Sequence, residues 1–209
     1  MFLQMPGFND LNIDTITIDG DISILSEAVS EIDLLLQNLS NETEEMKSTL
    51  LRYSGSNQGN QYLKCAAAAL NLSACLYEAA ESLNLLQRKV VEYCEMVIAY
   101  DELNITISPP HSFYVEPINV EINTGTIRFD LTEMIIVHDS LEAYSQNVRD
   151  GFRILSSHVD DIGTVWHDPQ YDDFVDCIED VSSAVLPKCA QVEEYKDYLH
   201  NIITHITTS

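Results

Sequence analysis

The sequence predicts a mainly α protein, in which two tandem long helical hairpins form a four-helix bundle and a short β-hairpin or strand connection joins the two repeats. Three observations predict this fold. Apolar residues recur with the period of an amphipathic helix over long stretches. The same pattern returns 109 residues further along the chain. Apolar residues make up 45% of the sequence against 21% charged residues, with only 7 glycines and 6 prolines, so a folded core is expected.

The first repeat follows an extended N-terminal segment, residues 1–20, and occupies residues 21–102. Two helices are expected in it, because alternate spacings of three and four residues select apolar side chains. We call these positions the seam. In the first helix seven of eight seam positions are apolar: Leu25, Val29, Ile32, Leu36, Leu39, Thr43, Met46 and Leu50. In the second helix all eleven are apolar: Tyr62, Cys65, Ala69, Leu72, Leu76, Ala79, Leu83, Leu86, Val90, Tyr93 and Val97.

The second repeat occupies residues 130–209 and keeps the seam in register. When 109 is added to each seam position of the first repeat, sixteen of nineteen positions remain apolar without a gap. The first helix then carries Met134, His138, Leu141, Ser145, Val148, Phe152, Leu155 and Val159. The second carries Tyr171, Phe174, Ile178, Val181, Val185, Lys188, Val192, Tyr195, Leu199, Ile202 and Ile206. We interpret the chain as a tandem duplication.

Capping residues mark the helix starts. Asp130 followed by Glu133 is a capping box, in which the first side chain accepts from a free amide and the second reaches back. Asp168 precedes a proline, which places a capping carboxylate immediately before the last helix. The equivalent positions of the first repeat hold Asp21 and Gly59.

The connection between the repeats, residues 103–129, contains prolines and alternating β-branched residues. Residues 120–122 and 126–129 on either side of an Asn-Thr-Gly turn predict a short β-hairpin. Residues 15–18 and 105–107 are candidates for further strands. The alternative is an extended connector that lies along the helices.

Charge excludes one class of partner and sets the expected compartment. The formal charge is -24, from 34 acidic and 10 basic residues, which argues against binding of nucleic-acid phosphate. No apolar run is long enough to span a membrane, and the first residues lack the features of a signal peptide. We therefore expect synthesis in the cytoplasm. The five cysteines form no CxxC pair and are expected to be reduced.

Motifs that carry chemistry were sought and not found. The six histidines include no HExxH, and His200 and His205 are five residues apart, a spacing that does not place them on one helical face. His138 falls on the seam, where a satisfied core or boundary histidine is the favoured interpretation over a pH-sensitive group. No phosphate-binding glycine loop, nucleophile elbow or dinucleotide fingerprint occurs. We expect no catalytic residues, no metal site and no cofactor, and hence not an enzyme.

The turn of the second repeat reads Trp166-His167-Asp168. Long antiparallel helices joined by such a turn resemble the WxG superfamily of small type VII secretion proteins, also called ESAT-like, whose motif is Trp-x-Gly or a Trp-x-Asp variant. The same columns of the first repeat read Asn57-Gln58-Gly59, with glycine present and tryptophan replaced. The resemblance covers residues 21–206, each repeat being one family unit. The family's Tyr-x-x-x-Asp/Glu export signal is absent from the C-terminal end of the sequence.

The resemblance implies a non-enzymatic bacterial protein of type VII secretion, acting as a secreted factor or as the targeting partner and chaperone of a larger toxin effector. Its partners would be that effector or the secretion ATPase, and a homodimer is a further option. The chain would then leave the cytoplasm through the type VII pathway without a signal peptide. Trp166 is expected either to close the end of the bundle or to dock a partner. The residues expected to carry recognition are Trp166, His167, Asp168, Asn57 and Gly59.

Carboxylates concentrate at the start of the last helix. Five of them define what we call the acidic face: Asp172, Asp173, Asp176, Glu179 and Asp180. A solvated helix start that suits the helix dipole is one interpretation. The other is a surface that attracts a basic partner, which would make the chain an acidic immunity protein that binds and neutralises a cognate toxin. A third hypothesis, a DNA mimic, needs carboxylates spaced like duplex phosphates.

Overall fold

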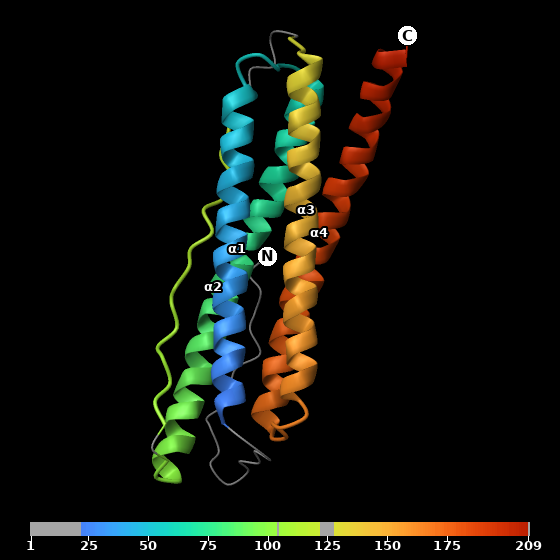
Figure 1. The fold of residues 1–209 in the computed structure, drawn as a ribbon. Helices are drawn as coiled ribbons and strands as arrows, with labels where there is room; N and C mark the ends of the chain where they lie inside the picture. The colour runs from blue at the N-terminus through green and yellow to red at the C-terminus, as the bar shows by residue number, and fades with distance from the viewer. Residues whose placement is uncertain (1–21, 104, 122–127, 209) are drawn as a thin grey trace. The chain divides into compact units, whose positions relative to one another are not determined.

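The computed structural model describes residues 22–103, 105–121 and 128–208, and these residues are mainly helical, as the seam predicts (Figure 1). Four helices follow one another along the chain. They are α1 (Ser23–Tyr53), α2 (Asn60–Tyr100), α3 (Leu131–Ile162) and α4 (Pro169–Thr208). Their lengths repeat in the same order, with 31 and 41 residues and then 32 and 40. None of the described helices is apolar enough over a sufficient length to cross a membrane.

The chain divides into two compact units, and each unit takes a segment from every helix. Unit 1 comprises Met1–Gln37, Glu78–Tyr114 and Gly151–Ser183. Unit 2 comprises Asn38–Tyr77, Val115–Asp150 and Ala184–Ser209. Each unit therefore has its own core, built from seam residues of four helical segments, since a helix must bury its apolar stripe against other helices.

The seam is buried where the sequence predicts it. All eight seam positions of α1 and all eight of α3 have buried side chains. The departures are half-buried Val97 in α2, half-buried Tyr171, Lys188, Tyr195 and Ile202 in α4, and exposed Ile206 at the end of α4. Thr43, a polar seam residue, is buried with a partner, since its Oγ1 lies 3.2 Å from the Tyr144 hydroxyl. The matching apolar stripes of the two repeats are thus core stripes.

The two interhelical turns share hydrogen bonds at the 109-residue offset. The hydroxyl of Tyr62 donates to the carbonyl of Leu50, and the hydroxyl of Tyr171 donates to the carbonyl of Val159. In each turn a backbone amide also closes the end of the preceding helix at 3.0 Å, from Asn57 in one and Trp166 in the other. Equivalent tyrosines at the starts of α2 and α4 therefore join the two helices of each hairpin.

The prediction of a β-hairpin in the connector is wrong for the described residues. Residues 105–121 form no strand, and the structure there matches the extended alternative. The backbone bonds to helix side chains instead: the amide of Ile118 donates to Ser73 Oγ at 2.9 Å, and Asn84 Nδ2 donates to the carbonyl of Phe113 at 2.7 Å. Some apolar residues of this segment, such as Val115, are buried. Their burial accounts for the alternation of apolar and polar residues. Residues 122–127, the expected hairpin tip, lie outside the described part.

Two further expectations concern residues beyond the described ranges. The N-terminal segment 1–20 with its candidate strand at residues 15–18, and the helix cap expected at Asp21, both fall there. Residue 128 takes part in one isolated antiparallel bridge, in which Arg128 and Gln58 exchange backbone hydrogen bonds of 2.9 and 3.3 Å. This bridge attaches the end of the connector to the turn between α1 and α2.

Candidate recognition turns and acidic face

The turn between α3 and α4, in unit 1, is organised around a fully buried tryptophan. Trp166 stacks on Tyr93 of α2, with ring centroids 5.2 Å apart. The rings of Tyr171 and Phe174, from the first turns of α4, lie at 5.8 and 5.7 Å. A buried tryptophan removes a large apolar area from water and needs a partner for its indole N–H. Of the two roles considered for Trp166, the buried side chain matches closure of the bundle end.

The indole partner is the carboxylate of Asp168. Its Oδ1 accepts from Trp166 Nε1 at 2.7 Å and from the backbone amides of Gln170 and Tyr171 at 3.0 and 3.3 Å. The predicted N-cap of the last helix is therefore confirmed. The other oxygen, Oδ2, accepts from the Tyr93 hydroxyl. A buried carboxylate with four donors is well stabilised without a cation, because charge-assisted hydrogen bonds replace its water.

The same arrangement acts on Tyr93. Burial raises the pKa of the Tyr93 phenol well above its usual value of 10, and the hydrogen bond to Asp168 raises it further. Tyr93 therefore stays protonated and remains a donor to the carboxylate. We call Trp166, Asp168, Tyr93, Tyr171 and Phe174 the Trp166 cluster.

The residue between tryptophan and aspartate is presented to solvent. His167 is exposed, as are Thr164 before it and Pro169 after it. A partner that recognises this turn would contact the exposed His167 ring, while Trp166 and Asp168 fix the backbone that presents it. The structure thus separates the predicted motif into two buried residues and one accessible residue.

The turn between α1 and α2, in unit 2, depends on Asn57. The side chain of Asn57 is buried, and its Oδ1 accepts from the amide of Asp130 at 2.9 Å. Its Nδ2 donates to Glu133 Oε2 at 2.8 Å. Asp130 Oδ1 accepts from the amide of Glu133 at 3.1 Å, so half of the predicted capping box is confirmed. The other half is wrong, because Asn57 satisfies the amide that Glu133 was expected to reach.

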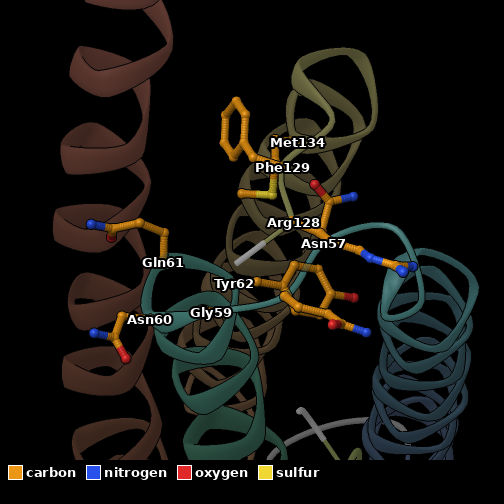
Figure 2. A pocket seen from close by; sticks show the side chains of 9 residues that line it. Asn57, Gly59, Asn60, Gln61, Tyr62, Arg128, Phe129 and Met134 are labelled. Carbon is orange, nitrogen blue, oxygen red and sulfur yellow. The ribbon is translucent and has the colours of Figure 1, made fainter. Parts of the chain in front are cut away.

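Gly59 directly precedes α2 and has a backbone conformation that favours glycine. Its φ is 108°, in the left-handed region where a Cβ is strained. In the first repeat Gly59 occupies the position that is equivalent to Asp168 of the second repeat, but glycine has no carboxylate. A pocket of about 290 Å³ lies beside it (Figure 2). Lining residues are Asn57, Gln58, Gly59, Asn60, Gln61, Tyr62, Arg128, Phe129 and Met134.

The pocket is lined by amide and apolar side chains together with the phenol of Tyr62 and the guanidinium of Arg128. Figure 2 shows Phe129 and Met134 close together, with the Arg128 side chain extending towards the turn, where its Nη1 donates to the carbonyl of Gly55 at 3.4 Å. None of its lining residues carries a carboxylate, an imidazole or a thiol. The chemistry that this pocket offers is hydrogen bonding and apolar contact, which suits the binding of a protein segment.

The acidic face lies on the first turns of α4 in unit 1. Asp172, Asp176, Glu179 and Asp180 are exposed, and Asp173 is half-buried. Burial raises the pKa of the Asp173 carboxyl above its usual value, and the neighbouring charges of Asp176 and Asp172 add to the shift. None of these five carboxylates forms an ion pair with a basic side chain of the described residues. The face therefore presents uncompensated negative charge.

Charge is also distributed unequally between the units. Unit 1 contains 21 acidic and 3 basic side chains, and unit 2 contains 13 and 7, which gives formal charges of -18 and -6. Most of the ion pairs to lysine and arginine, such as Arg149–Glu193 at 2.6 Å and Lys47–Glu116 at 2.9 Å, lie within unit 2. The negative potential of the chain is therefore concentrated in unit 1.

The contacts that Tyr93 and Asn57 make at these sites are not evident from the sequence alone. Tyr93 was placed on the seam, but nothing in a single sequence indicates that its hydroxyl meets Asp168, 75 residues later. A tyrosine on an otherwise aliphatic seam is the available signal, because a buried phenol needs a polar partner. The link from Asn57 to Glu133 spans 76 residues and leaves no local pattern.

Comparisons with protein-family models, with curated proteins and with solved structures found no match for this chain. A function must therefore be argued from the two turns and the acidic face, together with the resemblance of the Trp-x-Asp turn.

Proposed function

We propose that this chain is a non-enzymatic helical binding protein of type VII secretion, acting as a secreted factor or as the targeting partner of a larger toxin. The observation that carries the proposal is the Trp166 cluster. A tryptophan and an aspartate two residues apart are both buried and bonded to each other, and the histidine between them is exposed.

The construction of this turn suits recognition. An exposed residue contributes most to specific binding when its backbone is already held in one conformation, because less entropy is then lost on binding. Asp168 holds the turn through the indole and two backbone amides, and Gly163 allows the close approach of Tyr171. His167 is thereby presented from a rigid support at the junction of two long helices.

Export of an effector encoded beside this gene tests the proposal. His167→Ala should reduce export at least tenfold while helicity and the unfolding midpoint stay unchanged, since the side chain is exposed. Thr164→Ala, an exposed change in the same turn, is the matched control and should leave export intact. Deletion of the gene should abolish export. Normal export in the deletion strain would reject the role in secretion, and normal export with His167→Ala would reject the turn as the recognition element.

The charge of unit 1 favours a second candidate, an acidic immunity protein that occludes a basic toxin surface. Like charges on neighbouring helix turns repel one another, so an acidic face without cations is retained at some cost to stability. A basic partner would compensate it and would be attracted at long range. This function would use the acidic face rather than the His167 turn.

The salt dependence of binding to an adjacent toxin tests this second candidate. The triple variant Asp172→Asn, Asp176→Asn, Asp180→Asn should weaken binding at least tenfold and flatten its dependence on salt. The triple variant Glu27→Gln, Glu95→Gln, Asp101→Asn removes the same charge from exposed positions elsewhere in unit 1 and should have a much smaller effect. Equal effects of the two variants, or no binding by the wild type, would reject the acidic face as the inhibitory surface.

A further inference from the structure

A histidine and two carboxylates gather on one side of α3 in unit 2. One ring nitrogen of His138 and one carboxylate oxygen each from Asp139 and Glu142 all lie within 4.8 Å of one another. His138 and Glu142 are four residues apart, a spacing that brings side chains together on a helix. Asp139 and Glu142 are exposed, so packing against other side chains does not fix their carboxylates.

His138 itself is incompletely satisfied. The residue is 8% exposed, and its Nδ1 lies 2.9 Å from Asp139 Oδ1. Its Nε2 is buried and has no hydrogen-bond partner. A buried polar atom without a partner calls for an explanation, and an absent ion is one of the recognised ones.

A second imidazole, from another helix, lies beside the ring of His138. The ring of His200, on α4, has its centroid 5.6 Å from that of His138, with an angle of 39° between the ring planes. Along the sequence, the nearest histidine to His200 is His205, five residues later on the same helix. The pairing of His138 with His200 arises from the packing of α3 against α4 within unit 2.

We propose that His138 and Glu142 bind a divalent metal of the zinc class together with His200, whose exposed ring must turn to bring a nitrogen to the group, and that Asp139 orients the imidazole of His138. A metal-binding histidine usually donates its other ring N–H to a carboxylate, which fixes the tautomer and strengthens the ligand. Asp139 stands in that relation to Nδ1, which leaves Nε2 as the ring nitrogen that lacks a partner. Two imidazoles and a carboxylate suit zinc, cobalt and nickel rather than calcium or magnesium.

One cation opposes metal binding and provides a test. Lys196 Nζ lies 3.0 Å from Glu142 Oε1 and 3.4 Å from Asp197 Oδ1. The metal must compete with this ammonium group for Glu142, and the two positive charges repel each other. Lys196→Met should therefore tighten zinc binding several-fold. A purely structural role of the cluster would predict no such gain.

Zinc titration of the metal-stripped full chain tests the site. Calorimetry should show one Zn²⁺ bound per chain, and Zn²⁺ should raise the unfolding temperature in a way that EDTA reverses, because a ligand of the native state stabilises it. His138→Asn and His200→Asn should each weaken zinc binding at least tenfold, and Asp139→Asn should weaken it by a smaller factor.

His111→Asn is the matched control. His111 Nδ1 lies 3.0 Å from Asp33 Oδ2, so it reproduces the histidine–aspartate pair of His138, but its side chain is 78% exposed. This variant should bind zinc like the wild type. Far-UV circular dichroism must show that each variant keeps its helices. Zinc binding of wild-type strength in His138→Asn or His200→Asn, or the absence of a zinc-dependent rise in unfolding temperature, would overturn the proposal.

Discussion

At the scale of single residues, Asp168 links the turn between α3 and α4 to α2 and to the start of α4. Its carboxylate caps α4, accepts from the indole of Trp166 and receives the hydroxyl of Tyr93 from α2. Loss of a carboxylate in this position removes a helix cap and leaves two buried donors without an acceptor. Unsatisfied buried donors cost more than the hydrogen bond itself contributes, because their water is not restored.

Asp168→Ala is therefore expected to lower the free energy of unfolding by about 3 kcal/mol. Asp130→Ala is the comparison, since Asp130 caps α3 from an exposed position and its loss should cost about 1 kcal/mol. Urea unfolding followed by circular dichroism measures both. Equal losses in the two variants would show that the Trp166 cluster contributes no more than an ordinary cap.

Gly163 is required by space rather than by its backbone angle. A Cβ added there would overlap the hydroxyl of Tyr171, which is itself held by the carbonyl of Val159. Gly163→Ala should thus destabilise the chain by about 1–3 kcal/mol, the usual cost of overpacking. Gly55→Ala in the other turn meets no atom within 4 Å and should be close to neutral. Thermal unfolding of the two variants checks the contrast, and a neutral Gly163→Ala would contradict the described packing.

At the scale of elements, the seam could be read from the sequence because its period follows from helix geometry alone. Positions such as Leu36 and Phe152 are buried for the same reason that they repeat every three or four residues. The cap at Asp168 could likewise be predicted, since a cap acts on the next few residues. The connector could not: alternation around Val115 resembles a strand, but its backbone partners are Ser73 and Asn84, which are distant in sequence.

The helices also contain buried and half-buried tyrosines, which predict a response to alkaline pH. Burial raises the pKa of Tyr62, Tyr93, Tyr144 and Tyr195 above the usual value of 10. Above pH 10 the unfolded chain loses these protons while the native chain retains them, so the unfolded state binds fewer protons and stability falls as pH rises. The stability is fully present below pH 10 and is lost as pH rises towards the native pKa values.

Urea midpoints measured at increasing pH above 10 should therefore fall, and the phenolate absorbance of these four tyrosines should appear together with loss of helix. Tyr144→Phe should make this fall less steep, whereas Tyr100→Phe, at an exposed position, should not change it. Phenolate absorbance for all tyrosines well before helix loss would mean that these four phenols are accessible to solvent in the native chain.

At the scale of the whole molecule, the composition gives the total charge but not how that charge is divided between the two units. The total of -24 is visible in the composition, but its division into -18 and -6 depends on which segments share a unit. The acidic face adds local repulsion within unit 1, because Asp172, Asp176 and Asp180 follow one another at four-residue spacing.

Screening of this repulsion should stabilise the chain. The unfolding temperature is expected to rise as ionic strength increases from about 0.01 to about 0.1 M, where the Debye length shortens to about 10 Å. The variant with Asp172→Asn, Asp176→Asn and Asp180→Asn should unfold at a higher temperature at low salt and respond less to added salt. A wild-type midpoint that is independent of salt would show that the acidic face carries no repulsive cost.

Hydrogen–deuterium exchange of the full chain, read by mass spectrometry across a range of protein concentrations, decides whether one chain buries both copies of the seam. Residues 25–50 and 134–159 should exchange slowly and to a similar extent at every concentration, since their seam side chains are buried within a single chain. Fast exchange in either segment, or protection that appears only at concentrations where the chain associates, would contradict a duplicated hairpin that completes its own core.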